Sequence, residues 1–115
     1  MSDQVLDYEE LKERVQNDEE LLLELLDIFT EDYGPKREIL GNAIVSDNYE
    51  DLRNVAHSLK GASGNISAKI LREKLAVFEE MGAKNDTEGA EELLKELDVA
   101  YVDLAARIKE IKNQA

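Results

Sequence analysis

One histidine, at position 57, is the residue of this 115-residue chain best suited to chemistry. An imidazole side chain is largely neutral, and therefore nucleophilic, near pH 7. Acid–base catalysis would need a pocket and a partner residue, and the chain has no cysteine, no second histidine and no Ser-His-Asp spacing. No glycine-rich phosphate loop is present, so ATP is not the expected direct donor. What remains is covalent group transfer, in which the imidazole accepts a group and passes it on.

Residues 52–72 surround this histidine with a stretch that contains no acidic residue. At the chain average of 27 acidic residues in 115, about five would be expected there. The stretch holds Arg53, Lys60, Lys69 and Arg72, although the chain as a whole has a net charge of −13. Chance clustering is the simpler explanation. An acid-free, basic surface also suits a phosphoryl group.

A helical wheel places His57 on the outer face of its helix. Counted at 100° per residue from Leu52, His57 lies at about 140°, away from the apolar face. That face is formed by Leu52, Val55, Ala56, Leu59, Ala62 and Ser63. Gly61 and Gly64, at i+4 and i+7 from His57, each cost about 1 kcal/mol of helix stability relative to alanine. They mark an early helix end or a close helix contact, or they bare the imidazole for another protein. Lys60, at i+3, can offset added negative charge.

The elements that must position these residues all have helical periodicity, and we find no convincing β-alternation. Asp7 is expected to cap a short helix over residues 8–15. Asn17 lies three residues before a glutamate and predicts the start of a second helix over 18–33. The apolar face of this second helix is Leu22, Leu25, Leu26, Phe29 and Tyr33. The Gly34–Pro35 pair is expected to end or kink it before a further apolar segment.

Two more helices are predicted in the middle of the chain. Asp47 with Glu50 is the start signal for a helix over about 48–65, which carries His57. Ser67 can cap the next helix. The residues of that helix expected to point inward are Leu71, Leu75, Phe78 and Met81.

A long C-terminal helix starts at Thr87 or Asp86. At about 26 residues it would be about 39 Å long. Its apolar seam is Ala90, Leu93, Leu94, Leu97, Tyr101, Leu104, Ile108 and Ile111. Because it is longer than the helices over 18–33 and 48–65, its end should overhang or pack on the N-terminal helix. Homodimerisation through that overhang is a weaker alternative.

Short loops favour antiparallel neighbours. The sequence therefore predicts an all-α fold, an up-and-down antiparallel four-helix bundle with a short additional N-terminal helix, as a single domain over residues 1–115. The charge of −13 argues against binding to nucleic acid or to anionic membranes. No apolar run approaches the roughly 20 residues of a membrane span, and the N-terminus lacks a signal-peptide pattern. We expect a cytoplasmic protein.

The segment that surrounds the histidine also resembles a known motif. Residues 56–63, Ala-His-Ser-Leu-Lys-Gly-Ala-Ser, are similar to the His-x-Leu-Lys-Gly signature of histidine-containing phosphotransfer (HPt) domains. The resemblance extends to residues 17–29, 47–56 and 71–82. Such domains are four-helix bundles whose exposed histidine carries phosphate between the aspartates of receiver domains.

The resemblance implies a role for each residue of the motif. His57 would be the phosphoacceptor, through Nε2, and Lys60 would stabilise the phosphoryl oxygens. Gly61 would leave room for the ring and for an incoming receiver. Ser67 departs from the family, because many relatives have glycine there. Since serine can cap a helix, we expect this departure to alter the turn and not the activity.

The partners implied are receiver domains and hybrid histidine kinases, with Arg53, Ser58 and Gly64 as further contact residues. We expect a monomeric phosphocarrier and not an enzyme, with no cofactor of its own and Mg²⁺ on the receiver. One alternative is a phosphorylation-independent adaptor with the same fold. Another is a phosphotransfer domain from a larger histidine kinase, hybrid or chemotaxis-type, although the Met1 start favours a free-standing protein. The dimerisation domain of a sensor kinase fits less well, because its histidine is typically followed by an acid.

Overall fold

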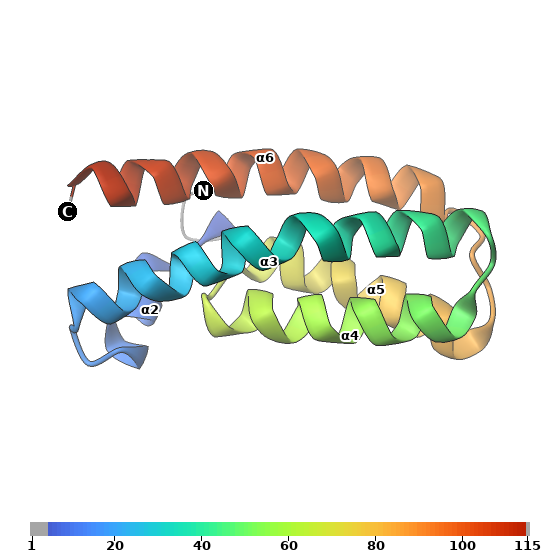
Figure 1. Ribbon diagram of the computed structural model, residues 1–115, viewed down its shortest axis with the longest axis horizontal. Coiled ribbons are helices and arrows are strands. Elements are labelled where there is room, and N and C mark those ends of the chain that lie inside the picture. Colours follow the sequence, from blue (N-terminus) through green and yellow to red (C-terminus); the bar gives the residue numbers. More distant parts are fainter. Residues whose placement is uncertain (1–4, 115) are drawn as a thin grey trace.

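The computed structural model describes residues 5–114, and these form helices and no strand. The helices are α2 (Tyr8–Arg14), α3 (Glu19–Val45), α4 (Tyr49–Asn65), α5 (Lys69–Lys84) and α6 (Ala90–Gln114). The four long helices, α3 to α6, run up and down beside one another, and the short α2 precedes them (Figure 1). The predicted four-helix bundle with an additional N-terminal helix is confirmed. None of the helices described is long and apolar enough to cross a membrane.

Side-chain caps set the starts of α2, α3 and α4. Asp7 caps α2, as predicted. The cap of α3 is Asp18 and not Asn17, and the cap of α4 is Asn48 and not Asp47. Asn17 and Asp47 instead have positive φ values of 63° and 53° and form the turn before each cap. The predicted starts were one residue early, because two adjacent polar residues can each serve as a cap and the backbone decides between them.

α3 continues without a break through the Gly34–Pro35 pair, so the predicted helix end at residue 33 is wrong. An interior proline removes one backbone hydrogen bond and costs about 3 kcal/mol relative to alanine. The carbonyl left without that bond belongs to the exposed Glu31, where water can reach it. Leu26, Tyr33 and Leu40 stay buried on one face on both sides of the proline. Packing of that face against the bundle outweighs the local cost.

The continuity of α3 changes how the long C-terminal helix fits. α6 has 25 residues and α3 has 27, so α6 is not longer than this neighbour, because α3 continues past residue 33. Both extend past the shorter α4 and α5, and α2 lies at that end of the bundle (Figure 1). The end of α6 does pack on the N-terminal helix, as the sequence predicted. The Arg107 guanidinium lies 5.6 Å from the centre of the Tyr8 ring, and Lys112 pairs with Asp27 of α3.

The turn between α4 and α5 also differs from the prediction. Ser67 has a φ of 59°, in the left-handed region, and α5 is preceded by Ala68, which makes no side-chain cap. Ser67 Oγ donates a hydrogen bond to Glu10 Oε1 at 2.7 Å, and the Ser67 carbonyl accepts one from Asp7 N at 2.9 Å. Ser67 therefore ties the turn to α2 and does not cap α5.

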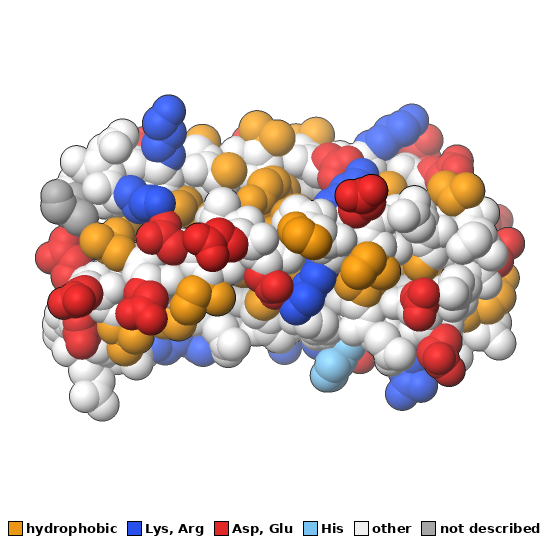
Figure 2. Space-filling model, viewed as in Figure 1, with side chains coloured by type: hydrophobic (Ala, Val, Ile, Leu, Met, Phe, Trp, Pro, Cys, Tyr) orange, Lys and Arg blue, Asp and Glu red, His pale blue; other side chains and the backbone are white. Residues whose placement is uncertain are grey.

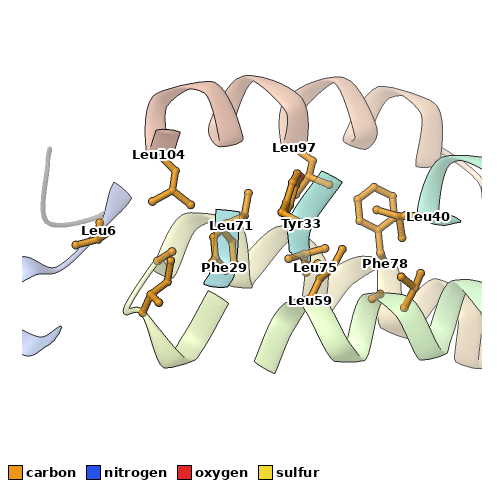
Figure 3. Close-up of a cluster of buried hydrophobic side chains, with 14 of the residues drawn as sticks. Leu6, Phe29, Tyr33, Leu40, Leu59, Leu71, Leu75, Phe78, Leu97 and Leu104 are labelled. Atoms are coloured by element: carbon orange, nitrogen blue, oxygen red, sulfur yellow. The ribbon is translucent and has the colours of Figure 1, made fainter. Parts of the chain in front are cut away.

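The core lies between the four long helices, with Leu6 at its N-terminal end (Figure 3). Phe78 of α5 is fully buried, and each leucine buried beside it contributes about 2 kcal/mol. Of the predicted α6 seam, the buried residues are Ala90, Leu97, Leu104, Ile108 and Ile111. Leu93, Leu94 and Tyr101 are half-buried. One face of α4 therefore packs against the core, and its other face is exposed to solvent.

Candidate functional site

His57 stands on the outer face of α4, as the helical wheel predicts. Its side chain is 70% exposed, and Figure 2 shows the single histidine at the surface of the bundle. The buried face of α4 consists of Leu52, Val55, Ala56, Leu59 and Ser63. A hollow of about 430 Å³ lies between α5 and α6 and does not include His57. The imidazole is therefore presented on a surface and not in a pocket.

Glu79 of α5 joins His57 to Lys60. Its Oε2 lies 2.8 Å from His57 Nδ1, and its Oε1 lies 2.6 Å from Lys60 Nζ. Because a carboxylate can only accept a hydrogen bond, Nδ1 is assigned the hydrogen. In the neutral imidazole, Nε2 then keeps its lone pair. The site thus combines an open nucleophilic nitrogen with an ammonium group one helical turn away.

The charge of Glu79 depends on these two partners. The hydrogen bond from Lys60 is the main reason why the pKa of the Glu79 carboxyl lies below its usual value of 4.5, and the bond to His57 acts in the same direction. Partial burial opposes both. Glu79 is therefore ionised at neutral pH and supplies a fixed negative charge beside Nδ1.

Ser58 lies on the opposite side of α4 from this group and faces α3. Lys36 Nζ donates a hydrogen bond to Ser58 Oγ at 2.9 Å and forms an ion pair of 2.6 Å with Asp32. Lysines thus flank the histidine on both sides of α4, Lys60 towards α5 and Lys36 towards α3. Each lysine already has a carboxylate partner.

Three positions near the site are glycine, and an added Cβ would meet different surroundings at each of them. A Cβ on Gly61 would meet no atom within 4 Å, so this position is open to an approaching molecule. A Cβ on Gly64 would lie 3.3 Å from Arg72 Nε, so Gly64 makes room for an arginine of α5. A Cβ on Gly82 would lie only 2.6 Å from Arg53 N, so Gly82 permits the close approach of α5 to α4.

The structure brings His57, Lys60 and Gly61 together on one surface, whereas Ser58 faces α3. Sequence reasoning gave no role to Glu79 or Lys36. A signal for Glu79 did exist. His57 and Glu79 are equally far in sequence from Ala68, so an antiparallel α4–α5 pair places them level with one another.

No comparable sequence pattern predicts the contact of Lys36 with Ser58, because that contact depends on how α3 packs against α4. The two arginines of residues 52–72 also have positions that the sequence did not show. Arg53 lies at the contact with Gly82, and Arg72 lies over Gly64.

Comparisons with known proteins agree with this arrangement. No curated protein sequence gives a significant match. Among solved structures, the fold is similar to that of histidine-containing phosphotransfer protein B (HptB) from Pseudomonas aeruginosa PAO1. The TM-score is 0.89 over 96% of each chain, at 24% sequence identity. The sequence profile of the Hpt domain matches residues 24–114, which include His57 and most of α3 to α6. The chain therefore belongs to the Hpt domain family.

Proposed function

We propose that this chain accepts a phosphoryl group on His57 from the aspartate of one receiver domain and passes it to another receiver in a two-component phosphorelay. One observation carries the assignment to His57. The imidazole is exposed, and Glu79 occupies its Nδ1, which leaves Nε2 open towards solvent. An approaching acyl phosphate would meet that nitrogen first.

In the transfer step, the Nε2 lone pair attacks phosphorus and forms an N–P bond. The bond between phosphorus and the aspartate oxygen breaks, and the aspartate leaves as a carboxylate. The hydrogen on Nδ1 stays in place, so the phosphorylated ring carries a positive charge. The Glu79 carboxylate, 2.8 Å from Nδ1, stabilises that charge. The reverse sequence delivers the group to the next receiver.

Lys60 is suited to balance the phosphoryl oxygens. Its ammonium has three hydrogens, and the bond to Glu79 at 2.6 Å uses one of them. The others are free to bind oxygens on the phosphorylated ring, one turn away on the same helix. Phosphoryl transfer depends mainly on such charge stabilisation and on in-line positioning.

Gly61 would let a receiver come close, because a Cβ there has nothing around it within 4 Å. The Mg²⁺ that supports such transfers is expected on the receiver, and we assign no cofactor to this chain. We also propose that the chain has no catalytic cycle of its own. The cytoplasmic location and the monomeric state stay predictions from the sequence.

The test is phosphoryl transfer from a panel of phosphorylated receiver domains, in the presence of Mg²⁺, to the wild type and to His57→Gln. Because His57 is exposed, the variant should fold normally, which circular dichroism checks. We expect an acid-labile, alkali-stable label on the wild type and none on the variant.

Two results would contradict the proposal. Label that persists on His57→Gln would mean that another residue accepts the phosphoryl group. A wild type that binds receivers but takes no label from any of them would instead identify a phosphorylation-independent adaptor.

A further inference from the structure

Two arginines lie across the α4–α5 contact in a reciprocal arrangement. Arg53 of α4 lies against Gly82 of α5, where an added Cβ would be 2.6 Å from Arg53 N. Arg72 of α5 lies against Gly64 of α4, where an added Cβ would be 3.3 Å from Arg72 Nε. Gly82 makes room for the backbone of α4 at Arg53, whereas Gly64 makes room for the side chain of Arg72. The two contacts lie on either side of His57 along α4.

These arginines differ from the nearby lysines in having no carboxylate partner among the described residues. Within residues 52–72, both lysines pair with carboxylates, one from α5 and two from the start of α2. Arg53 and Arg72 form no ion pair with any residue in the part of the chain that the structure describes. The acid-free stretch therefore presents two guanidinium charges without an ion-pair partner among the described residues. Glu50 lines the hollow beside Arg53, and Glu10 and Glu73 line the hollow beside Arg72.

The positions of the two arginines follow from helix geometry. Arg53 precedes His57 by four residues, or about 6 Å along the axis of α4, and Gly64 follows it by seven, or about 10.5 Å. Arg53 and Gly82 line a hollow of about 310 Å³, and Arg72 and Gly64 line another of about 340 Å³. Arg53 and the Gly64 position that Arg72 contacts are thus about 16 Å apart along α4, with His57 between them.

We propose that Arg53 and Arg72 bind two acidic groups of a receiver domain, one on each side of its phosphorylated aspartate. This inference rests on the proposed function. The chain carries a net charge of −13, so most of its surface repels an acidic partner, and these two charges make a local attraction. A guanidinium can hold a carboxylate by two parallel hydrogen bonds. Two such contacts would fix the rotation of the receiver about His57 and direct its phosphorus towards Nε2.

The experiment compares Arg53→Gln, Arg72→Gln and the double variant in transfer from the receiver that labels the wild type fastest. Lys109→Gln is the matched control, because it removes the same charge from α6, which Figure 1 shows across the bundle from α4. Each reaction is followed from about 50 mM to about 500 mM salt, which screens exposed charges. Phosphoramidate, a small phosphodonor that needs no protein docking, is run in parallel.

At low salt, the ratio of the receiver-dependent rate to the phosphoramidate rate should fall about 3-fold in each single variant and about 10-fold in the double. The difference from wild type should shrink as salt rises, and Lys109→Gln should match the wild type. A double variant no slower than Lys109→Gln would overturn the inference. An equal loss with phosphoramidate would also do so, since the arginines would then act on the chemistry of His57. A wild type unlabelled by every receiver would refute the proposed function itself, and this inference with it.

Discussion

Glu79 Oε2 lies 2.8 Å from His57 Nδ1, although 22 residues separate the two in sequence. The same carboxylate reaches Lys60 with its other oxygen. One side chain of α5 therefore orients both the nucleophile and the cation of α4. In the proposed transfer, Glu79 would act through His57 as a positioning residue, because it would not itself meet the phosphoryl group.

Replacement of Glu79 should slow transfer without unfolding the bundle. In Glu79→Gln the charge beside Nδ1 is lost, so the phosphorylated ring is less stabilised and the ring nitrogens share the hydrogen more evenly. We expect transfer to His57 to slow by about tenfold. Nitrogen chemical shifts of the imidazole should show the Nδ1-protonated form in the wild type and a mixture in the variant. Glu80→Gln, an exposed neighbour on α5, is the control that should change neither.

The depressed pKa of Glu79 makes a prediction about acid stability. The carboxylate is favoured in the folded state, so its contribution is fully present above the ordinary pKa of 4.5 and is lost as the pH falls through the lower, folded pKa. Below pH 4.5, the difference in free energy of unfolding between wild type and Glu79→Gln should shrink as the pH falls. Urea unfolding over a pH series measures this difference. A gap that widens as the pH falls below 4.5 would contradict the assigned ion pair.

Gly61→Ala should raise stability and lower function. The added methyl meets no atom within 4 Å, and alanine is favoured over glycine in a helix by up to about 1 kcal/mol. The urea midpoint should therefore rise. Transfer from a receiver should become slower, because the methyl occupies the surface that the partner must approach. Equal transfer rates in variant and wild type would show that this clearance is not needed.

Gly82→Ala should have the opposite effect on stability. Its methyl would lie 2.6 Å from the backbone nitrogen of Arg53, so α4 and α5 would have to move apart. We expect a loss of about 1–3 kcal/mol, measured by urea unfolding. The shift should also displace Glu79 from His57, which the imidazole nitrogen shifts would report. An unchanged midpoint would mean that the helices separate at little cost.

Two substitutions at Ser67 separate its backbone from its side chain. Ser67→Ala keeps the left-handed φ of 59° and loses the hydrogen bond to Glu10, so it should destabilise by about 1–2 kcal/mol. Ser67→Gly loses the same hydrogen bond, but glycine adopts a positive φ without the steric cost of a Cβ. Its free energy of unfolding should therefore lie within about 0.5 kcal/mol of the wild-type value. Thermal unfolding of both variants tests the order. If alanine proved the more stable, the left-handed backbone at residue 67 would not limit the stability of this turn.

Most of the candidate site could be predicted from the sequence, because the residues that indicate it lie within one helix. The exposure of His57 and the neighbouring Lys60 and Gly61 follow from the 3.6-residue period of one helix. Features that depend on two helices were missed, such as the bond of Glu79 to His57 and the room that Gly64 gives Arg72. The helix end predicted at residue 33 was wrong for the same reason, since packing of the buried face of α3 outweighs a local helix-breaking residue.

The exposed position of His57 on one face of a small bundle has a kinetic consequence. The molecule measures 42 × 21 × 20 Å, and a protein partner of standard size covers about 800 Å². In the proposed transfer, donor and acceptor would each have to cover the same imidazole with a footprint of this size. They would therefore bind alternately, and the relay step would follow ping-pong kinetics. An excess of either unphosphorylated receiver would compete with the other, and the flux would depend on the ratio of the two receivers as well as on their amounts.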